Sequence, residues 1–195
     1  MTVFTWKGER DTIMTPLDSI RYYKHFLQAG LMSMEPQTGH VKAWVGGIDY
    51  KYFQYDHVGQ GARQVGSTFK PFVYATAIEQ LNMSPCDTII DGPFMIRKGR
   101  HHVTEDWEPR NSDQKYRGMV SLKRALANSI NTISAKLIDK TGPEAVVEMT
   151  HKLGVTSEIP VQPSIALGAV DITVHDMVAA YSTFANKGVY IKPQF

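Results

Sequence analysis

The 195-residue sequence has a single cysteine, Cys86. One cysteine excludes a disulfide within the chain and a metal site built from several thiolates. No apolar run reaches the roughly 18 residues that a membrane-spanning helix needs, and the first ten residues lack an apolar secretory core. Basic residues exceed acidic ones by only two, and this balance argues against a nucleic-acid-binding function.

The residues that are present describe an ordinary globular chain, of which 43% is apolar and 21% is charged. The adjacent His101 and His102 would point apart in a strand and so rarely chelate one metal, and no metal site is expected. The segment from Gly61 to Thr68 nearly matches the phosphate-binding loop Gly-x-x-x-x-Gly-Lys-Ser/Thr, but Ser67 stands where that loop needs its lysine. We therefore expect neither a nucleotide nor another cofactor.

The stretch from Gly59 to Leu81 changes midway from polar and glycine-rich to apolar. Its apolar half repeats at helical steps through Phe69, Phe72, Val73, Ala77, Ile78 and Leu81. Ser67 is the expected N-cap of this helix, and Lys70 follows about one turn later on the same face. Because Pro71 has no N–H, the helix is expected to start slightly late or with a distorted first turn.

A hydroxyl and an amine stacked in this way at a helix start can act as nucleophile and base. The alternative is a capping Ser67 followed by a solvated Lys70. A second Ser-x-x-Lys pair, Ser112 and Lys115, has no apolar helix behind it to lower the pKa of the amine, and we interpret it as a solvated loop.

The remaining elements predict an α+β fold. Residues 2–6 read as a strand, 22–27 as a short helix, 29–34 and 40–45 as a hairpin, and 82–118 as irregular chain. Helices are expected over 122–128 with Ser121 as cap, over 131–140 and 143–154, and over 174–186 with a Thr173–Asp176 capping box. A strand is expected to begin at 189–191.

Ser129 and Asn131 fall at the junction between two of these helices. A hydroxyl and an amide two residues apart in an interhelical turn can point into one cleft. Both residue types are also common helix caps, and capping alone is the alternative interpretation.

Together these motifs resemble the transpeptidase domain of class A penicillin-binding proteins, in which Ser-x-x-Lys precedes a Ser-x-Asn and a Lys-Thr-Gly motif. The resemblance rests on four further stretches: Gln64-Val-Gly-Ser-Thr-Phe-Lys-Pro-Phe, Glu35-Pro-Gln-Thr-Gly-His-Val-Lys-Ala-Trp-Val-Gly-Gly47, Trp107-Glu-Pro-Arg-Asn111, and Ala166-Leu-Gly-Ala with the helix that follows it.

This likeness implies a β-lactamase/transpeptidase-like α+β fold with an antiparallel sheet flanked by helices, incomplete here. Residues 1–25 are expected to be an interdomain connector, and 26–195 the N-terminal part of the transpeptidase domain. The Lys-Thr/Ser-Gly motif is absent, so the chain is expected to be a fragment of a larger membrane-anchored protein.

The resemblance implies a peptidoglycan D,D-transpeptidase that acts through an acyl-serine. Ser67 is the expected nucleophile, Lys70 its base, Ser129 a proton relay, and Asn131 a partner of Lys70 and of the substrate amide. The same first step also serves a D-alanyl carboxypeptidase or a serine β-lactamase, and a non-catalytic peptide- or β-lactam-binding module is a third possibility.

The resemblance also supplies the expected contacts and setting. Gly66, Thr68 and Trp107 are expected to contact the substrate. The expected partners are peptidoglycan stem peptides, the lipid-linked precursor and β-lactam antibiotics, with no nucleic acid, metal or cofactor. The expected location is the periplasmic or extracytoplasmic face of the bacterial cell membrane.

Overall fold

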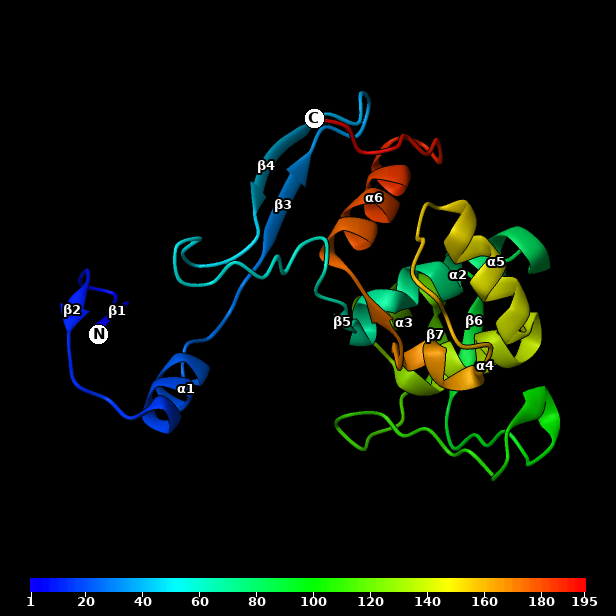
Figure 1. The fold of residues 1–195 in the computed structure, drawn as a ribbon. Helices are drawn as coiled ribbons and strands as arrows, with labels where there is room; N and C mark the ends of the chain where they lie inside the picture. The colour runs from blue at the N-terminus through cyan, green and yellow to red at the C-terminus, as the bar shows by residue number, and fades with distance from the viewer.

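The computed structural model describes residues 1–195 and confirms an α+β fold (Figure 1). The strands form four separate antiparallel pairs, β1–β2, β3–β4, β5–β8 and β6–β7, rather than one sheet. In chain order the elements are β1 (Thr2–Val3), β2 (Arg10–Asp11), α1 (Pro16–Lys24), β3 (Leu31–Met34), β4 (Val41–Val45), β5 (Arg63–Gln64), the 3₁₀ helix η1 (Gly66–Phe69), α2 (Lys70–Leu81), β6 (Thr88–Asp91), η2 (Arg100–His102), β7 (Gly118–Ser121), α3 (Leu122–Ala127), α4 (Asn131–Thr141), α5 (Pro143–Lys152), η3 (Pro163–Leu167), β8 (Asp171–Ile172) and α6 (Val174–Ala185).

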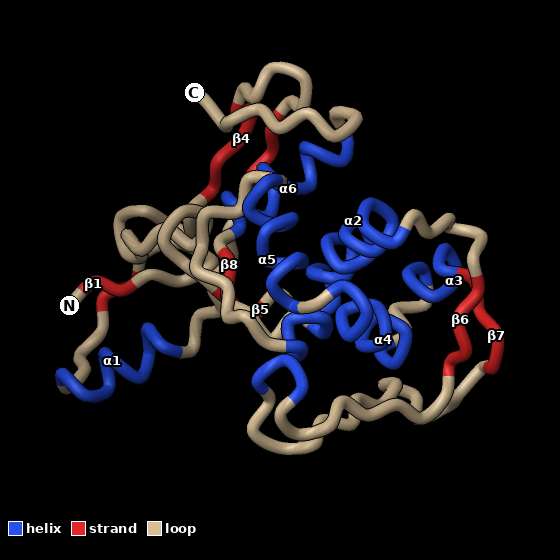
Figure 2. Tube along the Cα trace, turned by 90° about the vertical axis from the view of Figure 1, so that its right-hand side faces the viewer, coloured by secondary structure: helices blue, strands red, loops and turns tan.

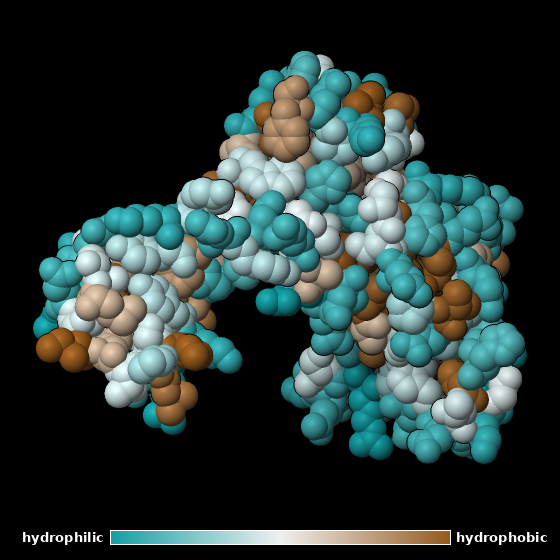
Figure 3. Space-filling view, viewed as in Figure 1, coloured by the Kyte–Doolittle hydropathy of each residue, from teal (hydrophilic) through white to brown (hydrophobic).

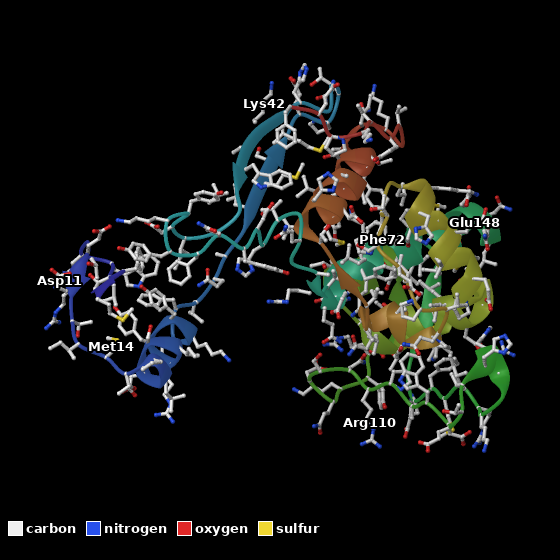
Figure 4. The ribbon with its side chains drawn as sticks, in the orientation of Figure 1. Asp11, Met14, Lys42, Phe72, Arg110 and Glu148 are labelled. Atoms are coloured by element: carbon white, nitrogen blue, oxygen red, sulfur yellow. The ribbon has the colours of Figure 1, made fainter.

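The core lies in a helical body in which α2 packs against α4 and α5 (Figure 1). Phe72 and Val73 of α2 and Ile133 and Leu137 of α4 are completely buried. Burial of each such side chain contributes about 1.5–3 kcal/mol. Figure 4 shows Phe72 pointing into this body. The apolar face of α2 ends earlier than the sequence pattern suggests, because Ile78 is exposed at the surface.

Local signals fixed most helix ends as predicted. Ser121 caps α3 by accepting a hydrogen bond from the Arg124 N–H, and Gly142 ends α4 with a φ of 84°. Thr173 likewise caps α6 through the Asp176 N–H. The capping box is incomplete, however, because the Asp176 carboxylate accepts hydrogen bonds from the Thr156 and Ser157 N–H groups instead of reaching back to the cap.

The predicted hairpin forms as β3 and β4, and α6 packs against β3 (Figure 1). The first residues form a smaller lobe, which Figure 2 shows apart from the helical body. Its centre is a cluster of aromatic rings in which Phe4 contacts Trp6, Phe26 and Phe53 at centroid distances of 5.2–5.5 Å. Figure 3 shows hydrophobic surface on this lobe, where Ile13 is fully exposed.

Four expectations for secondary structure were wrong. The strand expected over residues 2–6 ends at Val3. The first helix spans Pro16–Lys24 instead of 22–27, because Thr15 caps it and proline occupies its first turn. The irregular region 82–118 contains β6, which pairs with β7. No strand forms at 189–191; the Asn186 amide donates to the Val189 carbonyl and so extends the turn after α6, and Gln194 instead bridges to His40.

No helix has both the length and the apolar character needed to cross a membrane.

Candidate active site

Backbone hydrogen bonds to residues 168–170 hold the start of the segment that carries Ser67. Val65 N–H donates to the Val170 carbonyl at 3.0 Å, and Gly66 N–H donates to the Gly168 carbonyl at 3.1 Å. A Cβ on Gly168 would lie 1.8 Å from the Gly66 carbonyl oxygen, and Gly168 has a φ of 77°, so only glycine fits this close approach. The two backbone segments therefore fix where η1 begins.

Ser67 lies in η1 and is exposed, one turn before the buried Lys70 that begins α2. The Lys70 N–H donates to the Ser67 carbonyl. The prediction of a distorted first turn at Pro71 is confirmed, because that turn is 3₁₀ and α-helix begins only at Lys70. The prediction that Ser67 is the N-cap is wrong: Val65 holds that position in η1 and Phe69 holds it in α2, and no side chain caps either segment. The Ser67 hydroxyl is thus not committed to capping.

The Lys70 amine meets the interhelical turn between α3 and α4. Its Nζ lies 2.6 Å from the Ser129 carbonyl, 2.9 Å from Ser129 Oγ and 2.7 Å from Asn131 Oδ1. Three acceptors match the three protons of an ammonium. Ser129 can present both oxygens to Lys70 because its backbone adopts the left-handed conformation, with a φ of 52°.

Burial lowers the pKa of the Lys70 amine to about 8. Only 1% of the residue is exposed, and removal of water disfavours the charged form. At this pKa about a tenth of the amine is neutral at pH 7 and can accept a proton. The arrangement thus places a usable base one helical turn from an exposed serine.

Two of the expected substrate contacts, Thr68 and Trp107, each line a cavity. Thr68 lines a largely apolar cavity of about 580 Å³ between η1 and α6, and its carbonyl accepts a hydrogen bond from the Tyr181 hydroxyl at 2.7 Å. Trp107 lines a different cavity of about 330 Å³, with residues of η3 on the opposite wall. Neither cavity is lined by Ser67 or Lys70.

Sequence reasoning did not assign a role to Asn111. Its Oδ1 accepts hydrogen bonds from the N–H groups of Asn131 and Thr132, and the neighbouring Arg110 carbonyl accepts one from Asn131 Nδ2. Figure 4 shows Arg110 on the loop that runs along the lower edge of the helical body. The signal was the Pro-x-Asn spacing in the Trp107 stretch, but spacing alone does not show that this loop reaches α4.

The exposed Ser112 and Lys115 differ from this site. Both lie in a loop at the surface, as predicted for the second Ser-x-x-Lys pair.

Comparison with known proteins identifies the family of the chain. Residues 29–195 match the family model described as penicillin binding protein transpeptidase domain, and residues 1–27 match the penicillin-binding protein middle domain. Penicillin-binding protein 1A of Aquifex aeolicus is 40% identical over 171 residues, which cover 87% of this chain and 23% of the relative. The chain thus spans about a quarter of the length of this relative.

Solved structures show the same fold. The crystal structure of penicillin-binding protein 1A from Haemophilus influenzae matches with a TM-score of 0.80 and 31% identity, over 86% of this chain and 24% of that one. The PonA1 protein from Mycobacterium tuberculosis in complex with penicillin V matches with a TM-score of 0.72 and 26% identity, over 91% of this chain and 49% of that one. The chain belongs to the penicillin-binding protein transpeptidase domain family.

Proposed function

We propose that this chain carries the nucleophile and base of a serine peptidoglycan D,D-transpeptidase, an enzyme that cross-links stem peptides during bacterial cell-wall synthesis. The observation that carries the proposal is the buried Lys70 amine, one turn from the exposed Ser67 and bonded to Ser129 and Asn131. Serine activation by an adjacent base needs this kind of grouping.

In the first half-reaction, Ser67 Oγ attacks the carbonyl carbon of the penultimate D-Ala of a stem peptide. The hydroxyl proton passes to the neutral Lys70 amine, and the carbonyl electrons move onto oxygen. The Ser67 N–H supplies one oxyanion donor, a contribution of about 3 kcal/mol in comparable sites. Collapse breaks the amide C–N bond, and the terminal D-Ala leaves with a proton relayed from Lys70 through Ser129 Oγ, 2.9 Å away.

In the second half-reaction, an amine on a neighbouring stem attacks the acyl-serine ester. Lys70, neutral again, takes the proton that this amine loses. Collapse breaks the bond between carbon and Ser67 Oγ, and the oxygen regains its proton. Asn131 holds the Lys70 amine throughout, because its Oδ1 can accept a hydrogen bond from both the charged and the neutral form, more strongly from the charged one.

The substrate contacts of Gly66, Thr68 and Trp107 stay predictions, as does the assignment of residues 1–25 to a connector. The proposed substrates are stem peptides and the lipid-linked precursor, with β-lactams as covalent inhibitors. These substrates place the enzyme on the extracytoplasmic face of the cell membrane.

The test is covalent labelling of the natural-length protein by a fluorescent penicillin, with the modified residue identified by mass spectrometry. We expect one adduct on Ser67 and none in Ser67→Ala. The matched control is Ser112→Ala, which alters the solvated Ser-x-x-Lys pair and should label normally. Labelling of Ser67→Ala at the normal rate would refute the assignment.

The fate of the adduct separates the transpeptidase from its alternatives. A long-lived adduct together with cross-linked product from stem peptides supports the proposal. Rapid β-lactam hydrolysis indicates a β-lactamase, and release of D-Ala without cross-links indicates a carboxypeptidase. Reversible binding with no adduct indicates a non-catalytic module.

A further inference from the structure

The helix α4 starts without a cap of its own. Its N-cap position is held by Ile130, which has no side-chain oxygen. Ser129 and Asn131 flank that position and belong to residue types that often cap helices, yet their side chains bind Lys70. The first N–H groups of a helix have no partner within it and need an acceptor from elsewhere.

Asn111 supplies that acceptor from twenty residues upstream. Its Oδ1 lies 3.0 Å from the Asn131 nitrogen and 3.2 Å from the Thr132 nitrogen. This contact caps α4 from outside the helix, so neither Ser129 nor Asn131 is needed for the task. The competition between capping and catalysis at this turn is thereby removed.

The Asn111 carboxamide is locked in this orientation. Its Nδ2 donates to Asp91 Oδ1 at 2.8 Å and to the Lys115 carbonyl at 2.9 Å, so all its hydrogen-bonding capacity is used. Asp91 is 1% exposed and also accepts from the Thr132 hydroxyl at 2.6 Å and from the Arg117 N–H at 3.0 Å. The buried carboxylate therefore ties Asn111 and the first turn of α4 to the end of β6.

The residue before Asn111 completes the arrangement. The Arg110 carbonyl accepts from Asn131 Nδ2 at 2.9 Å, which turns Asn131 Oδ1 toward the Lys70 amine. Residues 110 and 111 thus fix both the helix that carries Asn131 and the orientation of its amide.

We propose that Asn111, held by Asp91, is a positioning residue for the Lys70 amine: it caps α4 in place of Ser129 and Asn131 and so leaves their side chains to hold Lys70. The inference rests on the proposed function for its catalytic consequence. The structural part, the effect of Asn111 on the surroundings of Lys70, stands without it.

Loss of the external cap has a defined consequence for Lys70. In Asn111→Ala the N–H groups of Asn131 and Thr132 lose their acceptor, so the first turn of α4 loosens and water reaches the amine. The acceptors around Lys70 are neutral and burial alone lowers its pKa, so hydration raises that pKa toward its ordinary value. Misplacement of a proton-transfer group typically slows a reaction about 10- to 100-fold.

The experiment compares wild type, Asn111→Ala and Asp91→Asn, which keeps the size of the side chain but removes its charge. The matched control is Asp176→Asn. Asp176 is another buried carboxylate, 3% exposed, and it binds the backbone of residues 156–157 with no hydrogen bond to the Lys70 group. One readout is the Lys70 titration by NMR with ¹³C-labelled lysine, and the other is the pH profile of Ser67 acylation in the natural-length protein.

We expect Asn111→Ala and Asp91→Asn to raise the pH midpoint of the Lys70 NMR titration. The midpoint of the acid limb of the acylation profile should move to higher pH by the same amount. Acylation should also become slower, while the initial non-covalent binding of the β-lactam is not weakened. Asp176→Asn should lower thermal stability but leave both midpoints in place. A loss of folded protein alone would scale the rate down without moving a midpoint.

An unchanged Lys70 midpoint and acylation rate in folded Asn111→Ala would overturn the inference, and so would an equal shift in Asp176→Asn. Failure of the proposed function looks different. Wild type would then form no adduct on Ser67, whereas the NMR titration would still report whether Asn111 controls the environment of Lys70.

Discussion

Acylation of Ser67 by a β-lactam should accelerate with pH through a midpoint near 8, the pKa of the buried Lys70 amine. An amine with the ordinary value of 10.5 would be neutral in about 3 molecules per 10,000 at pH 7, against about one in ten here. Burial thus raises the concentration of the free base about 300-fold, which corresponds to about 3 kcal/mol.

The assay is the acylation rate constant of the natural-length protein between pH 6 and pH 10, measured by stopped flow with a fluorescent penicillin. Ser67→Ala serves as the blank for spontaneous β-lactam hydrolysis at alkaline pH. A rate that is flat over this range, or that rises only toward pH 10.5, would refute the assignment of Lys70 as the base.

The same shift predicts a change in folding stability with pH. The folded pKa of Lys70 lies below its unfolded value, so the unfolded chain binds more protons between pH 8 and 10.5. The free energy of unfolding therefore gains up to about 3 kcal/mol from Lys70 as pH rises through this window. Lys70→Met should lack that gain in urea unfolding, and curves that stay parallel for the two proteins would contradict the shift.

Two further changes test the frame around the site. Asn131→Ala removes the Oδ1 that lies 2.7 Å from Lys70 Nζ, so the acylation rate should fall about 10- to 100-fold while circular dichroism shows an intact fold. An unchanged acylation rate would rule out a role of Asn131 in holding the amine. Gly168→Ala would place a Cβ 1.8 Å from the Gly66 carbonyl oxygen and should lower the free energy of unfolding by about 4 kcal/mol or more. The control, Gly99→Ala, has a φ of 86° but open space around it, and should lower that free energy by only about 1–2 kcal/mol. Equal losses would show that the close approach of Gly168 to η1 does not contribute to stability.

Local chemistry explains which elements could be predicted from the sequence. The Ser121 cap, the glycine at 142 and the proline at 143 each act on the backbone within a few residues, so the ends of α3, α4 and α5 follow from short patterns. The β6–β7 pair was missed because it joins Thr88 to Ser121, and the residues of two such short strands do not indicate a pairing over so long a sequence separation. Ile78 fits the apolar helix pattern and yet is exposed: spacing does not show where the covering elements end.

By itself, the sequence determined that Ser67 and Lys70 are neighbours, since three residues make about one helical turn wherever the helix lies. It also supplied Ser129 and Asn131 as a pair, but left open whether they cap a helix or hold the amine. Only the tertiary structure decided this: packing of α2 against α4 brings Lys70 to residues 59 and 61 positions away, and Asn111 takes over the cap. The physical reason is that a backbone N–H and a buried ammonium both need acceptors, and only the folded chain shows which oxygen each one receives.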